Sequence, residues 1–244
     1  MAEWFKDWFD SSEYLEVYKH RNDEDARRLF KLILSNVSIT PGGDVLDIAC
    51  GAGRHSLLFA SAGYKVTAFD LSRNLLKVAL QKNRELGLDI NFFNADIRRP
   101  SLKKQFDLVI NLFTSFGYFD SESENFALFK DANELLCGNG YFVFDYFNIS
   151  FLRNNLVPET TDSANGRTVI QKRCIKNGRV IKEIKLINAS GEKSYIESVR
   201  LYDVDEIIRA LNQAGLKVSK TFGDYAGGAF SKESSPRLII IARK

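Results

Sequence analysis

Apolar and polar positions along the first 150 residues alternate between strand-like and helix-like patterns. Short apolar runs predict strands at residues 44–49, 65–70, 90–95, 106–112 and 141–146. Apolar residues three and four positions apart predict helices at residues 54–62, 73–86 and 122–136. Strands that alternate with helices favour an α/β fold, in which a mostly parallel sheet is covered on both faces. Ligands in such sheets bind beyond the carboxyl ends of the strands.

The pattern changes after Asn148. Three strand-like runs, "RTVIQKRCIK", "RVIKEIKLIN" and "KSYIESVRLY", are joined by "NG" and "ASGE", which are typical hairpin turns. They predict an antiparallel insertion of about 35 residues. Asp203 and Glu206 then cap a helix, and the strands "AGLKVSKTF" and "RLIIIAR" end the chain.

These patterns divide the chain into three parts. Residues 1–40 have helical spacing throughout and predict an N-terminal helical lid. Residues 41–150 and 203–244 form the expected α/β core, and residues 151–202 form an inserted antiparallel β lid or substrate subdomain. The helix at 122–136 is expected to stop at "CGNG", because glycines favour the end of a helix.

Composition limits the classes of function. The chain has 244 residues, a net charge of +3, two histidines and three well-separated cysteines. We therefore expect no metal site, no disulfide framework and no purely electrostatic attraction to nucleic acid. No apolar run approaches the length of about 20 residues that spans a bilayer, and the first residues do not resemble a secretory signal, so we expect a cytoplasmic protein without a membrane partner.

The stretch "VLDIACGAGRHS", residues 45–56, carries the main functional signal. A glycine turn follows the first strand, Asp70 ends the second strand 19 positions after Gly51, and Asp96 ends the third. A carboxylate at the second position can accept both ribose hydroxyls of a nucleoside. A dinucleotide site would need a third glycine where this chain has Ser56. The residues therefore favour an adenosine cofactor without a diphosphate.

Five segments, taken in order, resemble the motifs of class I S-adenosylmethionine-dependent methyltransferases. They are "VLDIACGAGRHS", "AFDLS", "NADIRR", "FDLVINLFTSFGYF" and "LLCGNGYFVFDYFN". The chain is most similar to the small bacterial "methyltransferase domain" members whose substrates are unassigned. The resemblance implies S-adenosylmethionine as the cofactor. It also implies a Rossmann-like doubly wound sheet of seven strands, mostly parallel, whose antiparallel last strand lies beside the fifth.

The resemblance also implies roles for residues after each strand. The glycine turn passes under the methionine part of the cofactor, and Asp47 orders that turn. Asp70 binds the ribose, with Leu71 and Ser72 beside it, and Asp96 and Ile97 frame the adenine. Asn111 to Phe113 lie beneath the sulfonium. The expected contacts are Asp47, Ala49, Cys50, Gly51, Ala52, Gly53, Asp70, Leu71, Ser72, Asp96, Ile97, Asn111, Leu112 and Phe113.

Further candidates follow from position. Arg54 is expected to reach the cofactor carboxylate. One helical face carries three residues that either close over the cofactor or pack in the core, namely Tyr14, Tyr18 and Arg21. The catalytic residue is not fixed by the sequence. The candidates for a base or substrate contact are His55, Tyr18, Asn148 and Arg200.

The acceptor is expected to be a small molecule, because aromatic residues gather before the core and after the fourth and fifth strands. They are Trp4, Trp8, Tyr14, Tyr18, Phe113, Phe116, Tyr118, Tyr146 and Phe147. An RNA or protein acceptor is the alternative, since Lys and Arg outnumber Asp and Glu between residues 167 and 200. A non-catalytic S-adenosylmethionine-binding module and, less favoured, a nicotinamide-dependent oxidoreductase also stay open.

Overall fold

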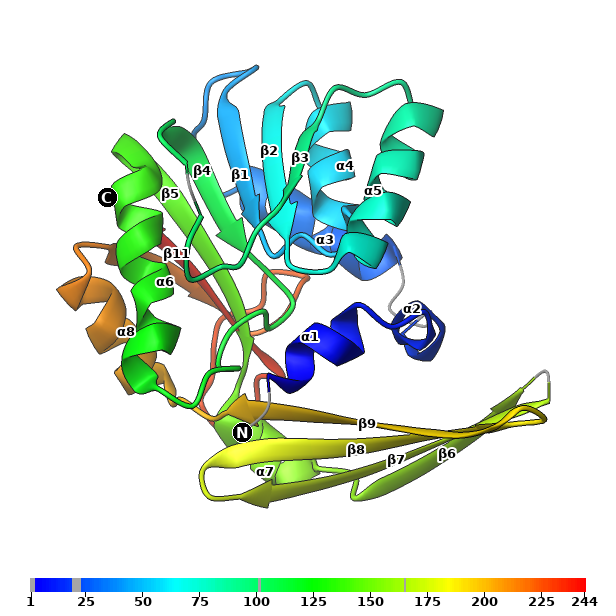
Figure 1. Cartoon of the computed structure of the whole chain (residues 1–244). Coiled ribbons are helices and arrows are strands. Elements are labelled where there is room, and N and C mark those ends of the chain that lie inside the picture. Colours follow the sequence, from blue (N-terminus) through cyan, green and yellow to red (C-terminus); the bar gives the residue numbers. More distant parts are fainter. Residues whose placement is uncertain (1–2, 19–22, 101, 165) are drawn as a thin grey trace.

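The computed structural model describes residues 3–18, 23–100, 102–164 and 166–244. Within these residues a seven-stranded sheet forms the centre of the molecule, in the order β10-β11-β5-β4-β1-β2-β3 (Figure 1). Its strands are β1 (Asp44–Ile48), β2 (Lys65–Asp70), β3 (Asn91–Asn94), β4 (Phe106–Asn111), β5 (Leu136–Phe147), β10 (Lys217–Phe222) and β11 (Arg237–Arg243). The predicted fold class is confirmed.

Strands β1 to β5 pair in parallel, and β11 pairs antiparallel with both β5 and β10. The central strands are buried on both faces, which explains why they appear in the sequence as nearly continuous apolar runs. All carboxyl ends of β1 to β5 therefore meet at one edge of the sheet. Asp47 and Asp145 interrupt this apolar pattern, on β1 and β5, and both are buried.

Helices cover both faces of the sheet. Helices α3 (Asp23–Leu34) and α4 (Arg54–Ser61) pack on one face, and α6 (Glu122–Leu135) and α8 (Val204–Gln213) on the other. Helix α5 (Arg73–Glu85) follows β2. Asp203 and Glu206 form the expected capping box of α8. No helix among the described residues has the length and apolar character needed to cross a membrane.

A second, antiparallel sheet lies beyond the carboxyl edge of the first (Figure 1). It consists of β6 (Glu159–Ala164), β7 (Arg167–Lys176), β8 (Arg179–Asn188) and β9 (Gly191–Arg200), and α7 (Ile149–Asn155) leads into it. The three predicted runs correspond to β7, β8 and β9. Strand β6 was not predicted, because its sequence "ETTDSA" is polar and pairs only along the edge of β7.

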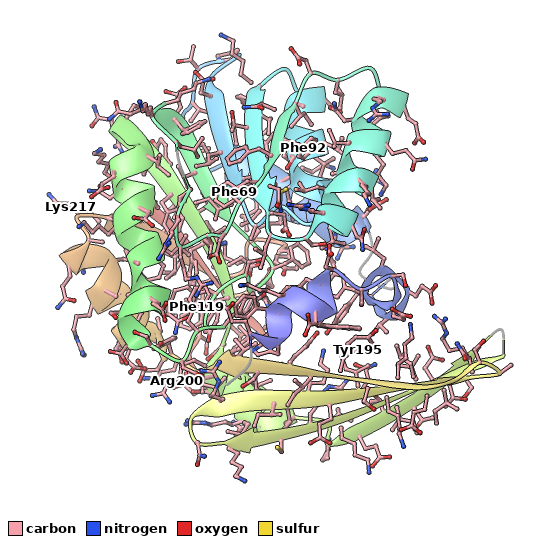
Figure 2. The ribbon with its side chains drawn as sticks, in the orientation of Figure 1. Phe69, Phe92, Phe119, Tyr195, Arg200 and Lys217 are labelled. Carbon is pink, nitrogen blue, oxygen red and sulfur yellow. The ribbon has the colours of Figure 1, made fainter. Side chains whose placement is uncertain are left out.

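Two short helices fill the space between the sheets. Helices α1 (Trp4–Phe9) and α2 (Glu13–Val17) pack against the second sheet. With it they form an apolar cluster that is separate from the core on the two faces of the central sheet. Trp8 is the centre of this cluster, with 1% of its surface exposed. Figure 2 shows Tyr195 projecting from β9 toward these helices, and its ring lies 4.5 Å from that of Trp8.

Helix α6 ends at Leu135, directly before "CGNG", as predicted. The next strand begins earlier than the predicted residue 141: residues 137–140 form an irregularity inside β5, between the β4 pairings of Leu136 and Tyr141. Asn139 has a φ of 65°, in the left-handed region, and the chain turns there. The helix therefore passes directly into the strand.

Candidate functional site

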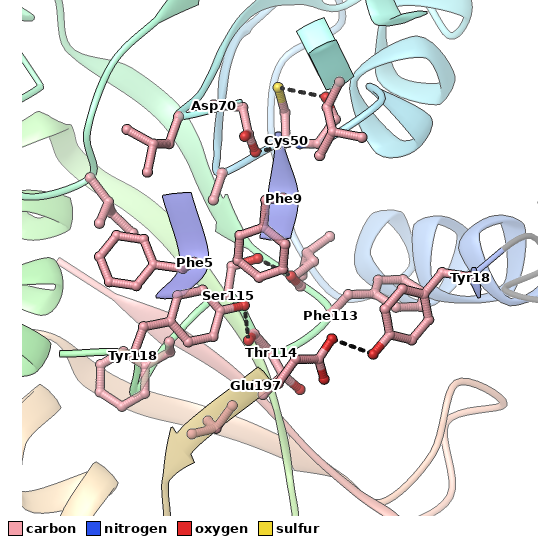
Figure 3. Close-up of a pocket in the computed structure, with 18 of the residues that line it drawn as sticks. Phe5, Phe9, Tyr18, Cys50, Asp70, Phe113, Thr114, Ser115, Tyr118 and Glu197 are labelled. Carbon is pink, nitrogen blue, oxygen red and sulfur yellow. Dashed lines mark hydrogen bonds between the residues drawn. The ribbon is translucent and has the colours of Figure 1, made fainter. Parts of the chain in front are cut away.

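A cavity of about 720 Å³ lies at the carboxyl edge of the central sheet. Its walls come from the turns after β1, β2, β3 and β4, from α1 and α2, and from the inner face of the second sheet. Figure 3 shows the cavity with Cys50 and Asp70 at one end and Glu197 at the other. Phe5, Phe9, Phe113 and Tyr118 lie between them, so the middle of the space is aromatic.

The glycine turn is held to the second strand by Asp70. One carboxylate oxygen of Asp70 accepts a hydrogen bond from the Gly51 N–H at 2.8 Å, and the other accepts one from the Ser72 N–H at 2.8 Å. Gly53 has a φ of 76°, and a Cβ there would lie 3.0 Å from Ala79. The turn therefore requires glycine at this position, and it brings its backbone to the cavity beside Asp70.

Asp47 is buried beneath the turn. Its carboxylate accepts a hydrogen bond from the Ser56 hydroxyl at 2.6 Å. Burial raises the pKa of Asp47 to about 7, although the bond from Ser56 opposes this. Ser56, which departs from a dinucleotide motif, is thus the partner of the acid inside β1.

This pKa predicts a pH-dependent stability. Because the pKa of Asp47 is higher in the folded chain than its ordinary value of about 4, the proton stabilises the fold fully below about pH 4, and this contribution is lost as the pH rises toward 7. Asp47→Asn does not titrate, and its amide oxygen can still accept from Ser56. We expect the variant to gain stability relative to wild type between about pH 4 and 7 and to level off above, as measured by urea unfolding.

A second variant checks the cause. Ser56→Ala removes the donor that lowers the pKa of Asp47. The pH range over which the contribution of Asp47 to stability is lost should therefore extend to higher pH. A stability difference between Asp47→Asn and wild type that stays constant with pH would contradict the assignment.

Asp96 lies in a charged cluster after β3. Its two carboxylate oxygens pair with Arg98, whose guanidinium also reaches Glu3 at 2.6 Å. Burial pushes the pKa of Asp96 upward, but the hydrogen bonds and charge of Arg98 outweigh it and leave the pKa lowered. Arg98 also stacks over the Phe119 ring at 4.7 Å. The cluster fixes the Asp96 carboxylate at the cavity wall and ties the chain before α1 to the core.

The loop after β4 is strained and supported by Asp145. Phe113 and Thr114 have φ angles of 57° and 64°, a conformation that costs non-glycine residues about 1–3 kcal/mol each. Asp145 accepts from the Phe113 N–H at 3.0 Å, from the Tyr225 hydroxyl at 3.1 Å and from Arg237 Nε at 2.9 Å. Arg237 also donates to the Thr114 hydroxyl at 2.9 Å. Together these bonds hold Phe113 in the cavity wall.

The role of Asp145 was not predicted from the sequence. The signal was present, since an acid inside an otherwise apolar strand is costly to bury unless it is paired. Asp47 carries the same signal on β1.

His55 faces the cavity as a neutral side chain. Burial, with a smaller effect from Arg54, lowers its pKa to about 3. Its Nε2 is buried without a hydrogen-bond partner in the described part of the chain. The imidazole lies 5.2 Å from the Phe113 ring, and the Arg54 guanidinium lies 4.8 Å from the same ring. An unpaired polar atom at a cavity wall is suited to a ligand.

The N-terminal helices are fastened to both sides of the cavity. Glu197 on β9 accepts hydrogen bonds from the Tyr18 hydroxyl at 2.5 Å and from Trp8 Nε1 at 2.7 Å (Figure 3). On the other side, the Asp10 carboxylate accepts from the Ser72 hydroxyl at 3.0 Å and from the Asn74 N–H at 2.9 Å. Helices α1 and α2 therefore close the cavity beside the ribose position expected at Asp70.

Most of the predicted cofactor contacts line this cavity. They are Asp47, Ala49, Cys50, Gly51, Ala52, Arg54, Asp70, Leu71, Asp96, Ile97, Leu112, Phe113, Tyr14 and Tyr18. Gly53, Ser72 and Asn111 lie behind its wall: Gly53 packs on α5, Ser72 caps α5, and the Asn111 amide donates to the Ile48 carbonyl. Arg21 lies outside the described residues.

Two expected substrate contacts lie elsewhere. The Asn148 amide donates to the carbonyls of Ser231, Lys232 and Ser235, so it fastens a loop instead of facing the cavity. Arg200 lies at the end of β9 (Figure 2) and donates to the Asn177 carbonyl. Neither lines the cavity. As substrate contacts both residues therefore stay predictions, and the sequence does not reveal how β9 and the last loop are fastened.

Known proteins similar to this chain are methyltransferases. The model of a family described as a methyltransferase domain matches residues 45–144. The cypemycin N-terminal methyltransferase of a Streptomyces species is 28% identical over 208 residues, which are 83% of this chain and 84% of that protein.

Two solved structures share the fold. A S-adenosylmethionine-dependent methyltransferase from Clostridium acetobutylicum has a TM-score of 0.81 and 19% identity, with 94% of this chain and 95% of that chain covered. The S-adenosylmethionine-bound amino pentose methyltransferase CalS10 from Micromonospora echinaspora has a TM-score of 0.68 and 20% identity, with 96% and 97% covered. The domain match and the named relative indicate that the chain is an S-adenosylmethionine-dependent methyltransferase, an enzyme with S-adenosylmethionine as its cofactor, and the two solved structures share its fold.

Proposed function

We propose that the enzyme transfers the methyl group to a small-molecule acceptor held between the central sheet and the second sheet. The observation that carries this proposal is the continuity of one cavity of about 720 Å³ from the glycine turn to Glu197. This volume lies within the range of roughly 300–1,000 Å³ of small-molecule sites. The cofactor, when bound, supplies a sulfonium methyl group and its own leaving group. The protein has mainly to align the acceptor and exclude water.

The proposed cofactor contacts start at the glycine turn. Its backbone, from Ala49 to Ala52, would pack against the methionine part, with Gly53 holding the turn on α5. Each Asp70 oxygen accepts one N–H and keeps a further lone pair that can accept from a ribose hydroxyl. Asp96, held by Arg98, and Ile97 would bind the adenine. Leu71, Leu112 and Phe113 complete the apolar walls.

The proposed acceptor position is the aromatic middle of the cavity, between the glycine turn and Glu197. His55 stays neutral at pH 7 because of its low pKa, so its role is to hold the acceptor by a hydrogen bond and not by charge. The N-terminal helices cover this part of the cavity and exclude water, which favours a small acceptor. CalS10, the fold neighbour above, is named for an amino pentose.

An RNA acceptor is less favoured by the arrangement of charges. The basic residues of the insertion do not form one outer surface, since Arg173 and Lys182 line the cavity. On the outer face, Lys172 forms an ion pair with Glu159. A peptide amino terminus is the second candidate, because the cypemycin enzyme is named for that acceptor.

Thermal-shift titrations with S-adenosylmethionine, S-adenosylhomocysteine and NAD test the cofactor assignment. We expect stabilisation by the first two and a far weaker effect of NAD, because the turn lacks the third glycine. Incubation with labelled S-adenosylmethionine and separate metabolite, RNA and protein fractions tests the acceptor. Label that enters only RNA or protein would overturn the small-molecule proposal.

A further inference from the structure

A row of charged side chains crosses the second sheet on the face that lines the cavity. Arg173 on β7 lies opposite Lys182 on β8, and Lys182 lies opposite Glu197 on β9. All three line the cavity. Neighbouring strands lie about 4.8 Å apart, so the row places two cations and one anion side by side.

The rest of this face is mainly apolar. Ile184 and Leu186, farther along β8, are buried under α1 and α2. Val180 and Val199, on the other side of the row, also line the cavity. Charges in such a face are costly unless they are paired or meet a ligand.

Lys182 and Glu197 satisfy each other. Their charged atoms lie 2.8 Å apart, and the side chains are 17% and 15% exposed. Lys182 also donates to the Tyr18 hydroxyl, and Glu197 accepts from Tyr18 and Trp8. This pair therefore serves to fasten the N-terminal helices.

Arg173 is left without an acid. Its guanidinium donates to the Thr160 hydroxyl at 3.1 Å and the Gln171 side-chain carbonyl at 2.9 Å, and more weakly to the Val157 carbonyl at 3.5 Å. All three acceptors are neutral, and in the described part of the chain no carboxylate forms an ion pair with it. The adjacent cavity wall, from Leu152 and Leu156, is apolar.

We infer that Arg173 binds an anionic group, a carboxylate or a phosphate, on the acceptor, whose apolar part packs on Leu152, Leu156 and Val180. An arginine fork matches both anions in geometry, and a partly buried site strengthens the pairing. The inference rests on the proposed function, because it specifies the acceptor of that same cavity.

Two other partners for Arg173 are less consistent with the residues: an acid of this chain, and the carboxylate of the cofactor. Asp23 and Asp25 also line the cavity, but they begin α3, on the side of the central sheet. The carboxylate of the cofactor is the other anion in the cavity. Helices α1 and α2 lie between the second sheet and the carboxyl ends of β1 and β2, where the glycine turn is (Figure 1), and Arg54 is closer to that turn in the chain.

Binding of matched probes to the complex with S-adenosylhomocysteine tests the inference. The probes are 4-hydroxyphenylacetate, phenyl phosphate, the neutral 4-hydroxyphenylacetamide and the cationic tyramine, measured by calorimetry. We expect at least one anion to bind in the millimolar range or better, and about tenfold or more tightly than the amide and tyramine. Comparison of the two anions distinguishes a carboxylate site from a phosphate site.

Variants assign the preference to Arg173. Arg173→Met should abolish it, Arg173→Lys should retain part of it, and Lys172→Met, the same change on the outer face of the same strand, should leave it unchanged. Affinity for S-adenosylhomocysteine should stay the same in all three.

Several results would overturn the inference. They are absence of anion binding, equal or tighter binding of the amide or tyramine, a preference that persists in Arg173→Met, and a loss of S-adenosylhomocysteine affinity in that variant. Failure of the wild type to bind S-adenosylhomocysteine at all would instead contradict the proposed function, so the two failures are distinguishable.

Discussion

Replacing Asp145 with alanine is expected to lower the free energy of unfolding by about 3–5 kcal/mol, the usual cost of removing one partner of a buried ion pair. Asp145 is fully buried and is paired with Arg237, whose side chain is 21% exposed. The substitution leaves Arg237, the Tyr225 hydroxyl and the Phe113 N–H without their common acceptor. Urea unfolding at neutral pH measures the loss.

The same variant should weaken cofactor binding. Asp145 and Arg237 hold Phe113 and Thr114 at positive φ, and without them this loop can relax to an ordinary conformation. Phe113 would then leave the cavity wall. Calorimetry with S-adenosylhomocysteine measures this loss of affinity, in buffer without urea and at a temperature where the variant is folded.

An acid outside the cavity lining provides the control. Asp203→Ala removes the N-cap of α8 and should cost about 1 kcal/mol without an effect on cofactor affinity. If Asp145→Ala costs no more than Asp203→Ala, the strained loop is supported by other contacts.

The sheet and its edge were predictable because their signals are local in the sequence. Apolar runs fix β1 to β5, and glycines or acids directly after them mark the carboxyl ends. Predicted and observed ranges differ by one residue or so at most of these elements; β5 is longer, since it includes the "CGNG" segment. Asp70 and the glycine turn meet across two neighbouring parallel strands, so their proximity follows from topology alone.

The acceptor side was less predictable because its contacts join distant segments. Trp8 and Tyr18 donate to Glu197 although they lie 189 and 179 positions before it in the chain, and no local pattern predicts these contacts. Basic residues of the insertion lie on both sides of the second sheet, which the sequence pattern alone does not reveal. Lys172 is exposed, whereas Arg173 and Lys182 line the cavity, because the second sheet turns their side toward it.

Replacing Asp70 with alanine is expected to lower the affinity for S-adenosylhomocysteine by about ten- to a hundredfold, since a hydrogen bond to a charged group contributes about 1.5–3 kcal/mol. Asp70→Asn should lose nearly as much. Both carboxylate oxygens accept backbone N–H groups, from Gly51 and Ser72, and an amide would set its own donor against one of them. Circular dichroism checks that both variants fold.

A ligand-side measurement separates loss of ribose binding from a disordered turn. The 2′-deoxy analogue of S-adenosylhomocysteine lacks one of the two hydroxyls proposed to donate to Asp70. Wild type should bind this analogue more weakly than the parent compound, whereas Asp70→Ala should bind the two alike. Asp44→Ala, at the opposite end of β1, should retain the wild-type difference, because the Asp44–Lys104 pair lies away from the cavity. If Asp70→Ala discriminates between the two compounds as strongly as wild type does, then the ribose lies elsewhere and Asp70 acts only by holding the glycine turn.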